Sequence, residues 1–271
     1  MFNIKYKNTT PYKSIGYKIH LIESAPYLFH FFFPHKRFTL PKHAPAIWPS
    51  RHSTHIPLQL WQTNYTAQVS IAVYLNYLFN RLLSPTCEYH FMGTEERDVF
   101  IHENFPEAIY KNYQRLQIGA AQADYWRVLV LNKYGGIYMD IDAHLVWPLQ
   151  WILKPEDDEL YIRMKDGRLT NYFIASKPDN PHLEKIILVI NQNIIEQNLT
   201  GTYEITGPGV FDRVLTNTSI HTTMYRTTCH QGNFTNEFFQ YIDKSQGKWT
   251  HEQKKIPVIQ SVDSNDKSHL S

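Results

Sequence analysis

The sequence predicts an α/β fold in which helices flank a central sheet. Between residues 56 and 197, segments with the two-residue alternation of strands take turns with segments of helical period. This order favours a sheet covered by helices. A helix, a double glycine and a strand follow one another without a break at residues 119–142. The length of 271 residues and the hydrophobic content of 42% suffice for one good-sized domain with an appendage.

The expected elements can be placed in order along the chain. Strands are predicted at residues 15–22, 56–62, 87–92, 136–142, 159–164 and 171–176, and helices at about 67–82, from Thr94 onward, at 119–134 and at about 181–197. The helix from Thr94 has Glu95 and Glu96 in its first turn, where the helix dipole favours acids. The proline-rich stretch 34–55 should form a linker over the surface.

The chain divides into a basic, proline-rich N-terminal extension at 1–55, a main α/β domain at 56–250 and a polar tail at 251–271 that should fray. The extension carries eight Lys or Arg and one acid, although the whole chain has a net charge of only +2. Its aromatic run at 27–33 either rests on an anionic membrane surface or packs into the core. The run is too short to span a bilayer.

Composition limits the classes of function and the compartment. The small net charge gives no reason to expect a nucleic-acid partner. Two cysteines provide no disulfide framework, and the N-terminus shows no signal peptide. We therefore expect a cytoplasmic protein, with peripheral contact to the cytoplasmic face of the inner membrane as the alternative that the basic extension leaves open.

The segment after the double glycine predicts a metal site. Along 136–142, Tyr138, Asp140 and Asp142 alternate with apolar residues and should share one face of a strand. Two carboxylates aimed the same way suit a hard divalent cation, which in turn holds a diphosphate. The alternative is a solvated strand end. On the preceding helix, Asp124 and Arg127 are three residues apart and share a face, so they form either part of the site or a structural ion pair.

These residues together resemble a known family of enzymes. The quoted motifs are Ala123-Asp124-x-x-Arg127, Tyr134-Gly135-Gly136-Ile137-Tyr138-x-Asp140-x-Asp142, Ile56-Pro57-Leu58-Gln59-Leu60-Trp61-Gln62-Thr63, and, more weakly, Asn171-Tyr172-Phe173-Ile174-Ala175-Ser176 with Thr206-Gly207-Pro208-Gly209. They are similar to DxD-containing glycosyltransferases of the Och1-like and bacterial capsule and lipooligosaccharide type (glycosyltransferase family 32), with clostridial glucosylating toxins as more distant relatives. The resemblance covers roughly residues 55 to 215.

The resemblance implies a GT-A-like nucleotide-binding sheet and a set of site residues. Asp142 would bind Mn²⁺ or Mg²⁺ directly, and Asp140 would reach the ribose or a metal-bound water. Asp124 and Arg127 would contact hydroxyls of the donor sugar. The remaining donor-site candidates are Trp61, Gln62, Tyr138, Asn171 and Gly207. Trp61 would stack on the nucleotide base, and its alternative is a core tryptophan beside the first strand.

Other candidates carry less weight. His144 continues the alternation and would be a third metal ligand if the strand extends that far; otherwise it is an ordinary edge residue. Lys244, Lys248 and Trp249 are candidates for a closing C-terminal segment. Relatives often carry a His before a Gly-Ser-Trp here, and Lys244 stands about where that His would be, which is a departure from the family pattern.

The resemblance therefore implies a metal-dependent, retaining hexosyltransferase. The donor would be a sugar nucleotide, a UDP-hexose rather than GDP-mannose, and the acceptor a glycan or lipid-linked glycan such as lipooligosaccharide or capsular polysaccharide. One alternative is a toxin-like effector that glycosylates a host protein. The other is a non-catalytic sugar-binding or interaction protein, which the retained Asp, Arg and Asp-x-Asp set disfavours.

Overall fold

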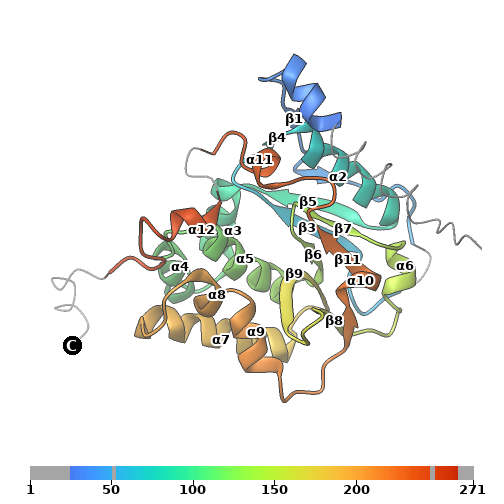
Figure 1. Cartoon of the computed structure of the whole chain (residues 1–271). Coiled ribbons are helices and arrows are strands. Elements are labelled where there is room, and N and C mark those ends of the chain that lie inside the picture. Colours follow the sequence, from blue (N-terminus) through green and yellow to red (C-terminus); the bar gives the residue numbers. More distant parts are fainter. Residues whose placement is uncertain (1–24, 51–52, 245–247, 262–271) are drawn as a thin grey trace, which may run out of the picture.

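The computed structural model describes residues 25–50, 53–244 and 248–261 (Figure 1). A seven-stranded sheet runs through the molecule in the order β10-β8-β9-β6-β3-β5-β2. Its strands are β2 (His43–Ala44), β3 (Gln59–Thr63), β5 (Glu88–Met92), β6 (Gly136–Met139), β8 (Glu159–Arg163), β9 (Leu169–Ser176) and β10 (Thr222–Met224). The pairs β3–β5, β3–β6 and β8–β10 are parallel, and β6–β9, β8–β9 and β2–β5 are antiparallel. The predicted α/β fold is confirmed.

Helices cover both faces of this sheet and bury two apolar clusters. The longer helices are α2 (Ile71–Leu83), α3 (Thr94–Asn104), α4 (Glu107–Gln114), α5 (Gly119–Tyr134), α7 (Pro181–Glu196) and α9 (Pro208–Leu215). One cluster joins Trp61 and Tyr138 of the sheet to α3, α4, α5, α7 and α9, and the other joins Leu60 and Ile137 to α2. Neighbouring strand residues thus enter opposite clusters, as the two-residue period requires.

The central strand β6 is buried on both faces. Ile137, Tyr138 and Met139 are each at most 1% exposed, which is usual for strands with helices on either side. The predicted alternation is therefore correct in direction, but the polar-facing side is covered by α5 rather than open to solvent.

The two glycines before β6 are required by their backbone conformation. Gly135 has φ of 65° and Gly136 has φ of 105°, values that side chains other than glycine rarely adopt. A Cβ on Gly136 would lie 2.6 Å from the carbonyl oxygen of Gln59 in the neighbouring strand. The Gly135 N–H donates to Leu131 O at 2.8 Å and ends α5. This turn agrees with the prediction.

The predicted strand over 136–142 ends three residues early. β6 stops at Met139, and Asp140 and Asp142 lie in a turn that leads into β7 (Ala143–Leu145). The Ala143 N–H closes this turn on Asp140 O at 3.0 Å. An alternating pattern reads the same in a strand and in the turn that follows, so the sequence alone does not fix this boundary.

Several short elements surround the sheet that the sequence did not reveal. They are β1 (Phe38–Thr39), β4 (Gln68–Val69), α6 (Leu149–Ile152), α8 (Thr202–Ile205), α10 (Tyr225–Thr228), β11 (Cys229–Gln231), α11 (Glu237–Gln240) and α12 (Trp249–Glu252). β11 pairs with β7, with Gln231 opposite Ala143. This pairing brings a segment about ninety residues downstream beside the two aspartates.

Two predicted appendages are partly built into the domain. The stretch 34–55, expected as a surface linker, contributes β1, which pairs with β4, and β2, which is the edge strand of the main sheet. The tail was expected to fray, yet Val258 and Ile259 are buried and Ile259 bridges to Leu116. Backbone pairing accounts for both corrections. The predicted strand at 15–22 lies outside the described residues.

A helical segment near the start of the chain, residues 25–32, lies against a C-terminal segment that includes α11 (Figure 1). The Tyr27 hydroxyl accepts a hydrogen bond from Asn236 at 2.7 Å, and its ring lies 4.5 Å from that of Phe239. Arg37 forms two contacts with the carboxylate of Asp243, at 2.6 and 2.7 Å. Among the described residues, no helix is long and apolar enough to cross a membrane.

Candidate active site

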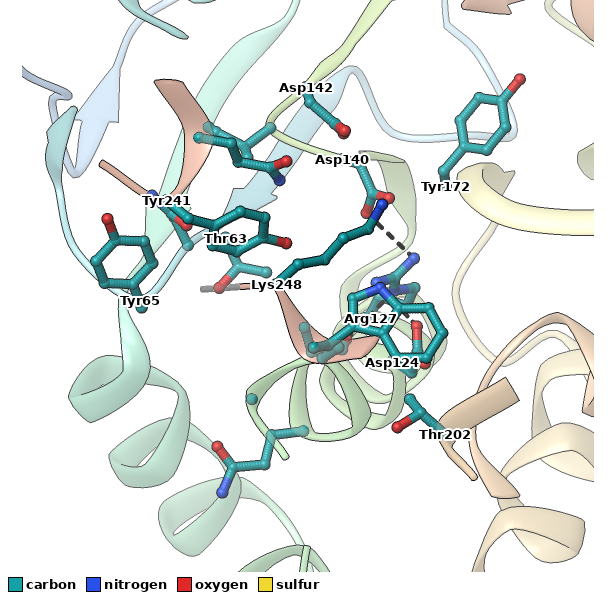
Figure 2. Close-up of a pocket in the computed structure, with 18 of the residues that line it drawn as sticks. Thr63, Tyr65, Asp124, Arg127, Asp140, Asp142, Tyr172, Thr202, Tyr241 and Lys248 are labelled. Carbon is teal, nitrogen blue, oxygen red and sulfur yellow. Dashed lines mark hydrogen bonds and ion pairs between the residues drawn. The ribbon is translucent and has the colours of Figure 1, made fainter. Parts of the chain in front are cut away.

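A cleft of about 720 Å³ lies where β3 and β6 end, and most of the predicted site residues line it. Its walls come from the loop after β3, from α3 and α5, from the turn after β6, from the start of β9, from α8 and from residues 231–244 and 248–252. Figure 2 shows Asp124 and Arg127 beside Asp140, with Asp142 next along the chain. Ligands of α/β proteins usually bind beyond the carboxyl ends of the strands.

The buried wall of the cleft is organised by Arg127. Its guanidinium lies 2.9 Å from Asp124 and 3.2 Å from Asp140, donates to Asn171 O at 2.6 Å, and stands 4.3 Å from the centre of the Tyr138 ring. Because Asp124 and Arg127 are only 7% and 5% exposed, this ion pair is shielded from water and differs from an ordinary surface pair.

Asp124 is fully engaged by the protein. One carboxylate oxygen accepts from Asn171 Nδ2 at 2.9 Å and pairs with Arg127, and the other accepts from the Thr206 hydroxyl at 3.2 Å. Burial and the nearby Asp140 raise the pKa of Asp124 to about 6, although Arg127 and the two hydrogen bonds oppose the rise. In this arrangement Asp124 fixes Arg127 in place.

Asp140 and Asp142 both face the cleft and share a single amide. Gln231 Nε2 donates to Asp140 at 2.9 Å and to Asp142 at 3.3 Å. Asp140 also accepts from the Tyr138 hydroxyl at 2.6 Å. Tyr138 therefore fixes one aspartate, while for the other the shared amide is the only side-chain donor that the described residues supply.

The charges at this end of the cleft are out of balance. Burial and the neighbouring carboxylate of Asp140 raise the pKa of Asp142 to about 7, against the smaller effects of Gln231 and Lys248. For Arg127, burial opposes the charge, yet Tyr138 and the surrounding acids raise its pKa on balance. Two carboxylates around one weak donor present the oxygen ligands that hard divalent cations prefer. The residues fit such an ion.

A buried arginine that the sequence analysis missed lies in the same cleft. Arg97 of α3 is 3% exposed, and its side chain donates a hydrogen bond to Thr94 Oγ1 at 3.3 Å, but within the described part of the chain its Nε has no hydrogen-bond partner. Burial lowers its pKa, and no carboxylate of the described residues forms an ion pair with it. A desolvated cation without a partner is costly unless an anion joins it. The signal in the sequence was its position: Arg97 lies three and four residues before Phe100 and Ile101 and therefore on the same, buried face of α3.

Trp61 and Gln62 do not line the cleft. The Trp61 indole is 4% exposed, donates to Gly135 O at 3.0 Å and stacks on His90 with the ring centres 4.3 Å apart. This placement corresponds to the core-tryptophan alternative. Gln62 donates to the backbone oxygen of Asp140 at 3.2 Å and so supports the turn from behind.

Gly207, which the resemblance implied, and His144, which the strand alternation suggested, do not line the cleft either. A Cβ on Gly207 would meet the backbone of Tyr203 at 3.0 Å, so this glycine allows α8 and α9 to approach each other. His144 lies in β7, is 7% exposed and stacks against His230. Burial lowers the pKa of His144 to about 4. Its ring contacts those of Phe79 and Phe234, and it does not line the cleft.

The C-terminal segment forms the remaining wall. Lys244, Lys248 and Trp249, the predicted closing residues, all line the cleft, together with Tyr241. Lys244 is held by Glu252 at 2.9 Å. In Figure 2 the Lys248 side chain extends toward the aspartates. Gln231 and Tyr241 were missed by the sequence analysis because nothing local marks a residue brought in by chain reversal.

Comparison with known proteins agrees with the predicted class. Residues 72–159 match the family described as "Glycosyltransferase sugar-binding region containing DXD motif". The predicted enzyme class, a glycosyltransferase, is confirmed, whereas the narrower assignment to family 32 stays a prediction. No curated protein sequence matches the chain significantly.

Solved structures show only low overall similarity. The structure titled "PaToxG Glycosyltransferase" has a TM-score of 0.47 and 15% identity, over 74% of this chain and 79% of that one. The ligand-free glycosyltransferase domain from the YGT toxin has a TM-score of 0.40 and 13% identity, over 55% of this chain and 54% of that one. Its UDP-bound form has a TM-score of 0.37 and 14% identity, with the same coverage. The sheet order of the chain itself establishes its fold.

Proposed function

We propose that this chain transfers a hexose from a nucleoside diphosphate sugar to a hydroxyl group of a glycan acceptor, with the help of a divalent cation. The observation that carries the proposal is the pair of cleft aspartates, Asp140 and Asp142, which share one amide donor beside the buried cation Arg127. This arrangement leaves negative charge that a divalent cation would balance.

Asp140 and Asp142 would hold Mn²⁺ or Mg²⁺, and Gln231, whose amide now lies between them, would move aside. When bound, the ion would neutralise charge on the departing diphosphate. Arg127 orients Asp140 from the inner side, and Asn171 and Thr206 keep Asp124 directed at Arg127. The protein thereby fixes its acidic groups before substrate arrives, which lowers the cost of reorganisation during reaction.

The phosphates have further partners in the cleft. Arg97 forms no ion pair with an acid of the described residues, and Lys248 extends toward the aspartates. We infer that these two cations contact the diphosphate, because charge-assisted hydrogen bonds to phosphate would satisfy the guanidinium that the protein leaves unpaired. The donor would be a UDP-hexose. Since Trp61 lies in the core, Tyr65 and Tyr241, which both line the cleft, would supply the aromatic surface for the base.

We propose retention of anomeric configuration, with the acceptor hydroxyl attacking on the face that the diphosphate leaves. The two inner carboxylates are already engaged, Asp124 by three donors and Asp140 by Tyr138, Arg127 and Gln231. Neither is available as a covalent nucleophile. The leaving phosphate oxygen would accept the proton of the acceptor hydroxyl as the new glycosidic bond forms.

The acceptor would be presented from a membrane surface, as with lipooligosaccharide or a lipid-linked capsular glycan. On the helical segment 25–32, Leu28, Phe31 and Phe32 are 62%, 79% and 65% exposed, and the extension that contains them is strongly basic in sequence. Aromatic side chains and basic residues together suit an anionic bilayer. Tyr27 of this segment contacts Asn236 at the rim of the cleft, and Arg37, just after it, contacts Asp243.

Donor hydrolysis tests the proposed chemistry. The purified protein is incubated with individual UDP- and GDP-sugars and Mn²⁺, and free sugar is measured. Release from one donor, lost with EDTA and with Asp142→Ala, is expected. A matched control is Glu159→Gln, which alters a buried carboxylate outside the cleft. If no donor is turned over and binding of sugars is unchanged in Asp142→Ala, the protein is a non-catalytic binding module.

An acceptor screen tests the remaining parts. Lipooligosaccharide, capsular oligosaccharides and small GTPases are offered with the active donor, and glycan labelling is expected over protein labelling. Sedimentation with vesicles of anionic lipid tests the membrane contact, which should weaken in Phe31→Ser/Phe32→Ser. Labelling of the GTPases alone would instead support the toxin-like alternative.

A further inference from the structure

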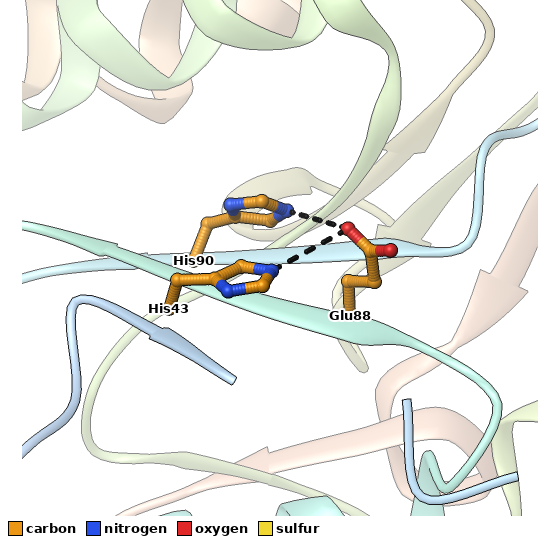
Figure 3. A group of neighbouring side chains, drawn as sticks. All are labelled: His43, Glu88 and His90. Carbon is orange, nitrogen blue, oxygen red and sulfur yellow. Dashed lines mark ion pairs between the residues drawn. The ribbon is translucent and has the colours of Figure 1, made fainter. Parts of the chain in front are cut away.

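A second cluster of metal-ligating side chains lies at the edge of the main sheet. It consists of His43 on β2 and of Glu88 and His90 on β5 (Figure 3). None of the three residues lines the cleft. The sequence analysis gave these histidines no role, because they are 47 residues apart along the chain.

Strand geometry accounts for the cluster. His43 and His90 are direct cross-strand partners in the antiparallel pair β2–β5, so their side chains project from the same face. Glu88 precedes His90 by two residues and therefore shares that face. The two imidazole rings lie with their centres 5.0 Å apart. Sheet register alone brings two nitrogens and a carboxylate together.

The distances between the three ligand atoms are close to those of an occupied metal site. The Nε2 atoms of His43 and His90 each lie 3.6 Å from the same carboxylate oxygen of Glu88, and the ligand atoms are all within 4.8 Å of one another. Zinc binds such atoms at about 2.0–2.2 Å, so tetrahedral ligand atoms lie about 3.3–3.5 Å apart. A small rotation of the exposed His43 ring would bring the remaining separation into this range.

One polar atom of the cluster is buried and lacks a hydrogen-bond partner among the described residues. His90 Nε2 is buried and has no hydrogen-bond partner, and its ring is fixed by stacking on Trp61. Among the described residues, Glu88 forms ion pairs with these two histidines and with nothing else. Buried polar atoms that lack a partner generally indicate an absent water, ion or ligand.

We propose that His43, Glu88 and His90 bind a transition-metal ion, zinc above all, with a fourth position open to water. Imidazole and carboxylate ligands together favour zinc, whereas the carboxylate oxygens of Asp140 and Asp142 in the cleft favour manganese or magnesium. The ion would link the edge strand β2, which pairs with the sheet through only two residue positions, to β5. Its role would be structural, and it does not depend on the proposed glycosyl transfer.

Zinc titration in excess Mg²⁺ tests the site, because Mg²⁺ occupies carboxylate sites and binds imidazole poorly. The wild-type chain should bind one more Zn²⁺ than His43→Ala or Glu88→Gln, which change exposed side chains. Co²⁺ should give the visible absorption of a tetrahedral nitrogen–oxygen site in the wild type only. His102→Ala, which removes an exposed histidine on α3, should match the wild type.

Thermal unfolding gives an independent measurement. At a hundredfold excess of free Zn²⁺ over its dissociation constant, the wild-type Tm should rise by roughly 5 °C, and the Tm of both variants should stay unchanged. Equal zinc stoichiometry in wild type and variants would overturn the proposal. So would a Tm loss in His43→Ala that is the same with and without Zn²⁺, since the cluster would then be an ordinary ion pair. Donor hydrolysis by His43→Ala should equal that of the wild type.

Discussion

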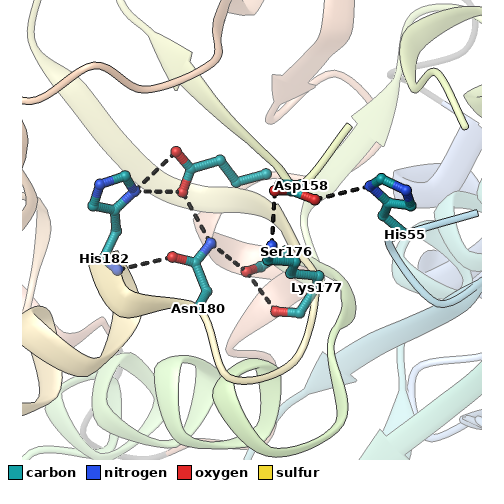
Figure 4. Close-up of polar contacts among 7 residues, drawn as sticks. His55, Asp158, Ser176, Lys177, Asn180 and His182 are labelled. Carbon is teal, nitrogen blue, oxygen red and sulfur yellow. Dashed lines mark hydrogen bonds and ion pairs between the residues drawn. The ribbon is translucent and has the colours of Figure 1, made fainter. Parts of the chain in front are cut away.

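The two ends of β9 carry two buried carboxylate clusters of opposite character. At its start, Asn171 faces the cleft, where Asp140 and Asp142 compete for one amide. At its end, Ser176 belongs to a network around Glu159 on β8 and Asn180 and His182 at the start of α7 (Figure 4). The same strand thus connects a site whose two carboxylates share one amide donor to a site whose carboxylate has two donors of its own.

In the Glu159 network, the carboxylate, the Asn180 amide and the His182 ring each have a hydrogen-bond partner. Glu159 accepts from His182 Nδ1 at 2.8 Å and from Asn180 Nδ2 at 2.9 Å, and Asn180 caps α7 by accepting from the His182 N–H at 2.8 Å. Such satisfied networks contribute to stability and specificity. The difference teaches that burial of an acid alone does not identify a functional site; an acid whose neighbours cannot neutralise it does.

The largest expected contrast is between activity and stability in Asp142→Asn. Donor hydrolysis should fall by roughly 100–1000-fold, as when one electrostatic element of an active site is lost. The same change should stabilise the metal-free protein by roughly 1–3 kcal/mol at pH 8. Because the folded-state pKa of Asp142 is raised, its charged form costs stability above the unfolded value. Denaturant unfolding in EDTA checks the sign, and a destabilised variant would contradict this account.

At the other end of β9, Glu159→Ala should act in the opposite sense. The change leaves the buried groups of Asn180 and His182 without their acceptor, which should cost about 2–4 kcal/mol of unfolding free energy. Urea unfolding measures the loss, and the milder Glu159→Gln is its control. Donor hydrolysis well below the Tm should be unchanged. If Glu159→Ala stays fully stable but loses donor hydrolysis, then the Glu159 network is not a purely structural counterpart of the cleft.

A third contrast concerns unpaired arginines. Arg97→Met should weaken UDP binding by roughly 10–100-fold, since a charge-assisted hydrogen bond contributes about 1.5–3 kcal/mol. Stability should be equal or higher, because an unpaired buried charge is removed. Arg115→Met is the matched control: Arg115 also has unpartnered guanidinium nitrogens but lies outside the cleft. Calorimetric titration of both variants with UDP and Mn²⁺ decides the matter.

The pH dependence of cation binding should reveal Asp142 directly. Its pKa of about 7 means that a proton must leave before an ion binds. Mn²⁺ affinity should therefore fall about tenfold per pH unit below about pH 7 and level off above it. Electron paramagnetic resonance of free Mn²⁺ measures this. An affinity that does not vary between about pH 5.5 and 8.5 would contradict it.

The smallest effect is expected at the exposed margin of the Glu159 network. Lys177 pairs with Asp158 at 2.7 Å, and Asp158 also contacts His55 at 2.9 Å (Figure 4). All three side chains are more than a third exposed. Lys177→Ala should change the unfolding free energy by less than about 0.5–1 kcal/mol. A larger loss in urea unfolding would show that the network extends to the surface.

Sequence patterns predicted the elements that contiguous residues form and missed the contacts between segments that are distant along the chain. Helix α5, the glycine turn at Gly135 and β6 follow from contiguous residues whose periods and conformations are legible. Asp124 and Arg127 share a helix face, so their pairing was also predictable. The fold class likewise followed from the order of elements.

The missed parts depend on distant segments. Gln231 reaches Asp140 from 91 positions along the chain, and no local pattern records that pairing. Trp61 could have faced a base or the core, and the choice depended on His90 and Gly135, which approach it only in the folded sheet. The turn at 140–142 had the alternation of a strand, but the residue pairing of β6 with β9 ends at Met139 and Phe173.

The contact between residues 25–37 and residues 236–243 has a consequence for how the cleft is held. Tyr27 and Arg37 tie the mouth of the cleft to the beginning of the chain. A surface that binds the helical segment 25–32 would therefore also stabilise residues 236–243 at the rim of the cleft. Trimming the polypeptide at residue 55 would therefore remove both the edge strand β2 and the two residues that contact the rim of the opening.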